Sequence, residues 1–260
     1  MLPLQVLGRR GAVADLPRLR IVFIALLGLL PVTLTPAMAT IGFRERLAEP
    51  TTLDLATGRL VLASYLAHFA NPMTTGHWNG WSYHNCGAYH SPDIIYPNGT
   101  RDIASIYHPL IGPYDSSDES VAEYHVRLAQ ASGIDVFVVG WNGISNFYDF
   151  PAINAAFKKL LKVAEELRFG VAVDYDAARY YVGRWGPSIA LISSRTEAWG
   201  AIRDDLAFAI SEFGRSPAYL KSEGKPVIFV FGNYALEPQE WTGIFKSLRT
   251  EGLDGYYVSM

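Results

Sequence analysis

The feature that most constrains the fold is an amphipathic helix pattern followed at once by a short apolar run. After a polar turn in which Ser116, Ser117 and Asp118 can cap a helix, apolar and aromatic residues recur at spacings of three and four. Gly133 supplies a helix stop, and Ile134 to Val139 is apolar almost throughout. A strand of this kind is buried on both faces, which is typical of parallel sheets covered by helices.

The same alternation of strand and helix recurs along the chain, which predicts βαβ units with right-handed crossovers. We expect strands at 59–65, 134–139, 169–173, 226–231 and 255–259, and further helices at 151–167, 196–213 and 238–250. The pattern predicts an α/β fold of the (β/α)8 TIM type. An eight-stranded barrel alone takes about 250 residues. Because this chain has 260 residues and five strands, we expect residues 59–260 to be the N-terminal part of a barrel truncated after about five strands.

An open doubly wound sheet is the rival architecture, because five strands would complete it. Such folds carry a glycine-rich phosphate loop after the first strand. Here Tyr65-Leu66-Ala67-His68 stands at that position, which favours the barrel.

Residues 1–39 have the pattern of an export signal, and residues 40–58 form a leader into the domain. Four arginines precede the apolar run Ile21 to Leu30, and Ala37-Met38-Ala39 is a small-x-small cleavage site. A membrane anchor is the alternative, but Pro31 and Pro36 break the run, which is shorter than the roughly 20 residues of a spanning helix. We therefore expect a secreted or periplasmic protein with no stable membrane anchor after signal cleavage.

Composition excludes one function class and favours another. The net charge is −3 and no basic stripe occurs outside the N-terminus, so we expect no nucleic-acid partner. Aromatic residues make up 13% of the chain and gather in loop-like sequence between Tyr65 and Tyr114. Aromatic faces pack against the C–H faces of sugars, so a carbohydrate substrate is favoured.

In a barrel, the active face lies at the carboxyl ends of the strands. The residues at those ends, with the aromatic residues of the long segment after the first strand, are the predicted substrate contacts. They are Tyr65, His68, Trp78, Trp81, Tyr107, Tyr114, Trp141, Asp174 and Tyr234. We expect no cofactor and no metal, because His84, Cys86 and His90 are more simply polar surface than zinc ligands.

Several short motifs occur in an order that resembles glycoside hydrolase family 99, the endo-α-mannosidase family, from about Leu60 to the end. The most specific is the run Gly112-Pro113-Tyr114-x-Ser116-x-Asp118. The others are Asn71-Pro72 with Gly76 and Trp78, Tyr96-Pro97-x-Gly99, Tyr107-x-Pro109-Leu110, Gly133-Ile134-x-Val136 to Gly140-Trp141, Gly224-Lys225-Pro226, Pro238-x-x-Trp241, and Gly252-x-Asp254-Gly255-Tyr256.

The resemblance implies a retaining glycosidase that acts on α-mannose-containing or related glycans with two carboxyl groups, one of them held protonated. The family's pair lies in an Asn-Glu-Trp-x-Glu stretch, and no such stretch occurs in these 260 residues. We therefore expect the catalytic pair to be missing from this chain, with Asp174 as the one candidate for proton transfer. A non-catalytic carbohydrate-binding relative is the alternative.

Overall fold

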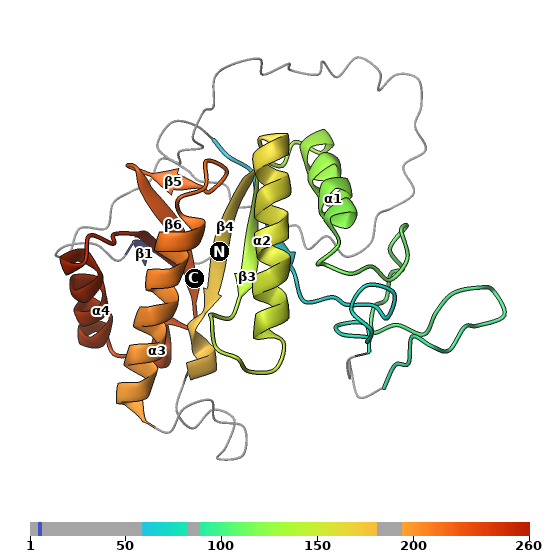
Figure 1. Ribbon diagram of the computed structural model, residues 1–260, viewed down its shortest axis with the longest axis horizontal. Helices are drawn as coiled ribbons and strands as arrows, with labels where there is room; N and C mark the ends of the chain where they lie inside the picture. Colours follow the sequence, from blue (N-terminus) through green and yellow to red (C-terminus); the bar gives the residue numbers. More distant parts are fainter. Residues whose placement is uncertain (1–4, 7–58, 83–88, 181–193) are drawn as a thin grey trace. The chain divides into compact units, whose positions relative to one another are not determined.

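The computed structural model describes residues 5–6, 59–82, 89–180 and 194–260 (Figure 1). The predicted leader and all of the predicted export signal except Gln5–Val6 lie outside these residues. The signal thus stays a prediction. Among the described residues, no helix combines the length and apolar character needed to cross a membrane.

Five parallel strands form the body of one sheet, and they follow one another in chain order. They are β2 (Leu62–Leu66), β3 (Val136–Trp141), β4 (Gly170–Asp176), β6 (Lys225–Phe231) and β7 (Tyr256–Ser259). Two short strands pair antiparallel, β1 (Gln5–Val6) with β7 and β5 (Lys221–Ser222) with β6. These two strands could not be predicted from the sequence, since a two-residue strand carries no periodicity.

The parallel strands of the sheet follow one another in sequential order. A doubly wound sheet reverses its strand order at a switch point. The order β2-β3-β4-β6-β7 has no reversal, so the mostly parallel α/β sheet is wound in one direction. With crossovers of one hand, the helices gather on one face of the sheet, as α2, α3 and α4 do in Figure 1.

Each predicted helix is present with nearly its predicted bounds. They are α1 (Glu119–Ala131), α2 (Phe150–Leu167), α3 (Arg195–Phe208), which continues through a π-helical turn η3 (Ala209–Phe213), and α4 (Pro238–Thr250). Asp118 caps α1 by accepting a hydrogen bond from the Ser120 backbone N at 2.8 Å. Gly133 follows α1 with φ of 76°, the left-handed conformation expected of a helix stop.

The register of the strands aligns their carboxyl ends. Leu66 lies beside Gly140, Gly140 beside Asp174, and Asp174 beside Phe229. Two short helical turns continue from this edge: η2 (Ala177–Tyr180) follows β4, and η4 (Asn233–Ala235) comes shortly after β6. The strand-end residues therefore share one edge of the sheet.

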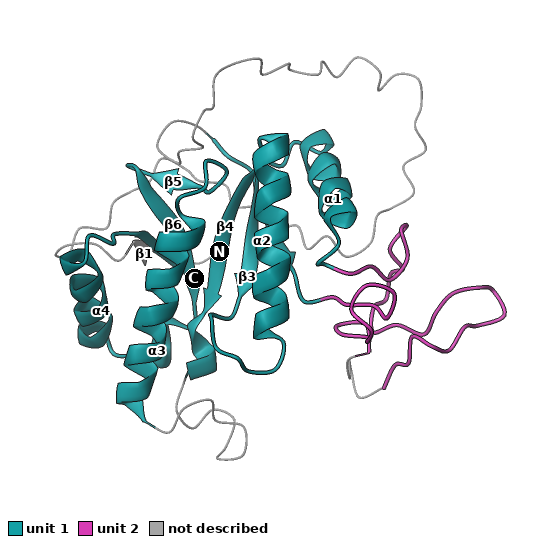
Figure 2. Ribbon diagram, viewed as in Figure 1, with its two compact units in different colours: residues 1–24, 52–68, 116–260 teal, residues 25–51, 69–115 magenta. Residues whose placement is uncertain are grey.

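The chain divides into two compact units (Figure 2). The sheet and its helices belong to the first, whose described residues are 5–6, 59–68, 116–180 and 194–260. The second comprises 69–82 and 89–115 among described residues, and these form turns and isolated bridges, Ala70 with Asn79 and Ile95 with Arg101, rather than helices.

Candidate functional site

Two carboxyl groups lie on one face of the sheet at the end of β4. Successive side chains of a strand point to opposite faces. The hydroxyl of Tyr175 donates a hydrogen bond to Asp205 of α3 at 2.7 Å, so Tyr175 faces the helices. Its neighbours Asp174 and Asp176 therefore both point to the face opposite the helices.

Asp174 is a half-buried residue with one buried carboxyl oxygen that lacks a hydrogen-bond partner. No group in the described part of the chain bonds its Oδ1. Burial, followed by the negative charge of Asp176, raises the pKa of Asp174 to about 7. A carboxyl group in this state keeps its proton in weakly acidic solution, and it can donate that proton to a hydroxyl group of a ligand.

Asp176, two residues further along the same face, is fully engaged. Its Oδ2 accepts a hydrogen bond from Nε of Arg179 at 2.9 Å within an ion pair, and its Oδ1 accepts one from the Ala178 backbone N at 3.1 Å. The edge thus combines a carboxyl group with an unused acceptor oxygen, Asp174, and a second carboxyl group that Arg179 holds in place.

His68, which follows β2, belongs to the same edge. Burial lowers the pKa of His68, the charge of Asp149 raises it and the charge of Arg179 lowers it. Both charged groups are therefore near enough to act on the imidazole. Arg179, which pairs with Asp176, is thus also near His68.

Tyr234 lies in η4, which comes after β6 at the same edge of the sheet, and 50% of its surface is exposed. Its turn is well anchored: Nδ2 of Asn233 donates a hydrogen bond to Oγ of Ser259 at the end of β7, and Nε1 of Trp241 donates one to the Asn233 carbonyl oxygen at 2.6 Å. This anchoring leaves an exposed aromatic ring on a fixed support.

Tyr65 and Trp141, also predicted to contact substrate, face the helices instead. Tyr65 is buried, and its hydroxyl lies 3.0 Å from Nδ1 of His125 in α1. Trp141 has an exposed fraction of 0% and stacks against Phe208 of α3 with 6.2 Å between ring centroids. Both residues are at the predicted edge of the sheet, because each lies at the end of its strand. Their side chains point into the core, because successive side chains of a strand point to opposite faces. Tyr65 keeps 9% of its surface exposed, and Trp141 keeps none.

The remaining predicted contacts lie in the second unit. Trp81 is buried there, where its Nε1 donates a hydrogen bond to the Tyr114 carbonyl oxygen at 2.8 Å and the two rings meet at 5.0 Å. Trp78 donates a hydrogen bond from Nε1 to Asp93 at 2.8 Å, and Tyr107 is exposed. Trp81 and Tyr114 thus form the small core of this unit, while Tyr107 lies on its surface.

A buried carboxylate that the sequence analysis missed holds the edge together. Asp205 of α3 accepts hydrogen bonds from the Ile144 backbone N at 2.8 Å and from the hydroxyls of Tyr175 and Tyr180. Burial raises the pKa of Asp205 to about 6, against the opposing effect of these hydrogen bonds. The signal was available, because Asp205 is three residues after Ile202 and so lies on the apolar side of the helix.

The described residues offer no metal centre: no group of three or more His, Cys, Asp and Glu side chains within them could hold an ion. Of the three residues considered as zinc ligands, His84 and Cys86 lie outside the described residues. The third, His90, has its Nδ1 2.8 Å from Oδ1 of Asp102.

Comparison with known proteins gives consistent matches. The model of the family described as glycosyl hydrolase family 99 matches residues 57–260. A glycoprotein endo-alpha-1,2-mannosidase-like protein of Danio rerio is 26% identical, with 68% of this chain and 37% of that protein covered. A glycoprotein endo-alpha-1,2-mannosidase of Rattus norvegicus is 24% identical, with 77% and 43% covered. The chain thus spans well under half the length of both relatives.

A solved structure shows the same fold. The GH99 endo-alpha-mannosidase from Bacteroides thetaiotaomicron superposes with a TM-score of 0.56 at 22% identity, over 76% of this chain and 54% of that one. The likeness supports the α/β fold derived above.

Proposed function

This chain belongs to glycosyl hydrolase family 99, and on that premise we propose that it forms the N-terminal part of a (β/α)8 barrel that acts on α-mannose-containing or related glycans. The strands wound in one direction are consistent with part of a barrel. The relatives it matches are longer, so the complete activity is proposed for a protein with further strands.

The observation that carries the proposal is the Oδ1 atom of Asp174, at the carboxyl edge of the sheet, which no described group bonds. A sugar presents hydroxyl groups that accept as well as donate hydrogen bonds. The protonated carboxyl of Asp174 donates to such a hydroxyl, while the ion pair of Asp176 with Arg179 lies beside it. His68 and Tyr234 supply an imidazole and an exposed ring to the same edge.

For the reaction, we propose a retaining mechanism with two carboxyl groups, in which one is held protonated by its surroundings. The Asn-Glu-Trp-x-Glu stretch expected to hold the pair is absent from the 260 residues. Our proposal is therefore that this chain binds glycan without cleaving it, and that Asp174 contacts the substrate. A non-catalytic binding protein is the second candidate, and the absence of that stretch is the observation that favours it.

The test is a calorimetric titration of the full chain with α-1,2-mannobiose. We expect saturable binding that Asp174→Ala weakens at least tenfold, while Glu123→Gln, which changes an exposed carboxylate of α1, has no effect. Wild-type binding should decline above pH 7, where Asp174 loses the donated proton, and Asp174→Asn should remove that decline because an amide donates at every pH. Absence of binding, or unchanged binding by Asp174→Ala, contradicts the proposal.

Turnover separates the binding and catalytic versions. We expect no release of reducing sugar by the chain alone. Saturable release that Asp174→Asn abolishes would instead assign proton transfer to Asp174. Release by a longer protein that contains this chain, but not by the chain itself, would favour the glycosidase over the non-catalytic relative.

Export is proposed on the sequence of residues 1–39 alone. When the gene is expressed in a bacterium with a periplasm, N-terminal sequencing of the exported protein should begin at Thr40. A cytoplasmic protein that retains Met1 contradicts the proposal.

A further inference from the structure

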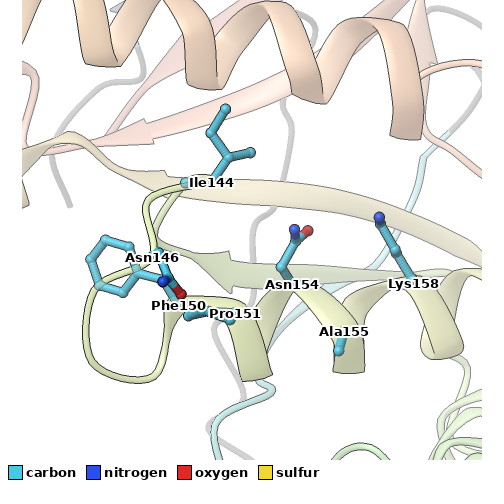
Figure 3. Close-up of a pocket in the computed structure, with 8 residues that line it drawn as sticks. Ile144, Asn146, Phe150, Pro151, Asn154, Ala155 and Lys158 are labelled. Atoms are coloured by element: carbon cyan, nitrogen blue, oxygen red, sulfur yellow. The ribbon is translucent and has the colours of Figure 1, made fainter.

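A cavity of about 310 Å³ lies outside the strand-end site, between the loop after β3 and the first turns of α2 (Figure 3). Gly143, Ile144 and Asn146 line it from the loop, and Phe150, Pro151, Asn154, Ala155 and Lys158 line it from α2. Ligand pockets measure about 300–1,000 Å³. This volume is at the lower end of that range, so it suits one ring rather than a long chain.

The polar groups of the cavity need a ligand that can donate a hydrogen bond. Oδ1 of Asn154 is buried and has no partner in the described part of the chain. A buried acceptor without a donor is unfavourable. Lys158 is one turn further along α2, so both side chains project from one side of the helix, as Figure 3 shows.

The apolar groups complete the recognition of a sugar ring. Ile144 and Pro151 are both exposed and line the cavity, where they offer apolar surface to C–H groups. Lys158 is held over the ring of Phe208 with its Nζ 5.5 Å from the centroid, so its ammonium group is positioned rather than free in solvent. An apolar ligand would leave Asn154 unsatisfied, and an anion would meet the Asn154 oxygen. A hydroxyl group suits both Asn154 and Lys158.

The walls of the cavity are fixed before any ligand binds. Asp205 accepts the hydrogen bond of the Ile144 backbone N at 2.8 Å, which holds the loop. Phe150 is buried at the start of α2 and contacts Phe147 edge-to-face with 5.9 Å between centroids. A preformed site binds with little ordering cost.

We propose that this cavity is a second sugar-binding site, which takes one neutral pyranose residue of a glycan on the helix side of the β3–α2 loop. The inference rests on the proposed function, since it takes a glycan to be the ligand. The site would hold a branch or a distant residue of the same glycan, because Asp174 points to the opposite face of the sheet.

The test uses the full chain and methyl α-mannopyranoside, followed by ¹H–¹⁵N NMR. We expect saturable shifts of the Ile144 backbone amide and the Asn154 side-chain amide. Lys158→Met should weaken this binding at least fivefold, and Asn154→Ala should do the same. The matched control is Lys159→Met, which removes the neighbouring exposed lysine of α2 that does not line the cavity, and it should change binding less than twofold.

The outcomes separate this inference from the proposed function. Asp174→Ala should abolish shifts around the end of β4 and leave those at Asn154 in place. Shifts confined to the end of β4, or binding at Ile144 that Lys158→Met does not weaken, overturn the second site while the proposed function stands. No saturable shift at either place contradicts both. Lys158 is exposed, so its variant should fold even where Asn154→Ala does not.

Discussion

A Cβ atom at position 143 would lie 2.2 Å from Oδ2 of Asp205, so the carboxyl group of Asp205 fills the space that any side chain there would need. Gly143 also has φ of 98°, which side-chain-bearing residues rarely adopt. The loop after β3 and helix α3 are therefore fitted to each other at one glycine and one buried carboxylate.

Gly143→Ala should destabilise the protein, by about 3 kcal/mol, because it adds backbone strain to a clash with a buried group. Thermal unfolding of the full chain measures this. Gly200→Ala is the matched control: Gly200 lies within α3 with no atom within 4 Å of its added Cβ, so alanine should stabilise the helix by up to about 1 kcal/mol. Equal effects of the two substitutions would contradict the fit between Gly143 and Asp205.

Tyr175→Phe should cost about 1 kcal/mol in the free energy of unfolding, because it removes one hydrogen bond to Asp205 and leaves the ring in place. Denaturant unfolding of Tyr175→Phe, Asp205→Ala and the double variant gives the coupling between them. Tyr124→Phe should have no effect, since no described group bonds the Tyr124 hydroxyl. Additive effects of Tyr175→Phe and Asp205→Ala would show that the hydrogen bond contributes nothing.

Much of the fold could be predicted because its signals are local. Helix α4 occupies the predicted residues 238–250, where apolar spacing and Pro238 mark the first turn. The strands β3, β4 and β6 are read from continuous apolar runs for the same reason. β5 could not be predicted, because its two residues acquire their pairing only from the neighbouring strand.

The face of the sheet to which each strand-end side chain points was harder to predict, because it depends on the register between strands. Trp141 lies beside Tyr175 rather than Asp174, so it shares the helix-facing side of Tyr175. A shift of one residue moves a side chain from one face to the other. Asp174 and Trp141 are both at strand ends, but their side chains point to opposite faces of the sheet. The place of Asp205 on the apolar side of α3 could be read from the sequence, but its partners Ile144 and Tyr175 could not, because they are 61 and 30 residues away.

Trp141→Phe tests whether Trp141 faces the helices, away from the face to which Asp174 points. We expect it to lower the melting temperature, with Trp141→Ala costing about 3–5 kcal/mol, because the side chain is fully buried. Its Nε1 has no hydrogen-bond partner among the described residues, so Phe loses only volume. Binding of α-1,2-mannobiose by folded Trp141→Phe should match wild type within twofold. A tenfold loss at unchanged melting temperature would instead place Trp141 in contact with the glycan.

The pH dependence of stability should report the carboxyl group of Asp174. Its pKa is raised from 3.8 to about 7 in the folded protein, so between these values the folded chain keeps a proton that the unfolded chain releases. Stability contributed by this group is fully present below about pH 4 and is lost as the pH rises to about 7. Asp174→Asn removes the titration, so it should be more stable than wild type at pH 8, by on the order of 2 kcal/mol after allowance for solvent screening.

Asp176→Asn is the companion variant, since the Asp176 charge is the second cause of the raised pKa of Asp174. Removing that charge should move the midpoint of the loss of stability with rising pH to a lower pH. Asp174→Asn should instead abolish the part of this loss that occurs above pH 6. The residual change up to about pH 6 belongs to Asp205, whose pKa is also raised by burial. Denaturant unfolding at pH 4, 6 and 8 measures all three proteins. Parallel curves for wild type and Asp174→Asn would mean that Asp174 is ionised in the folded protein, and the proton proposed for glycan binding would then be absent.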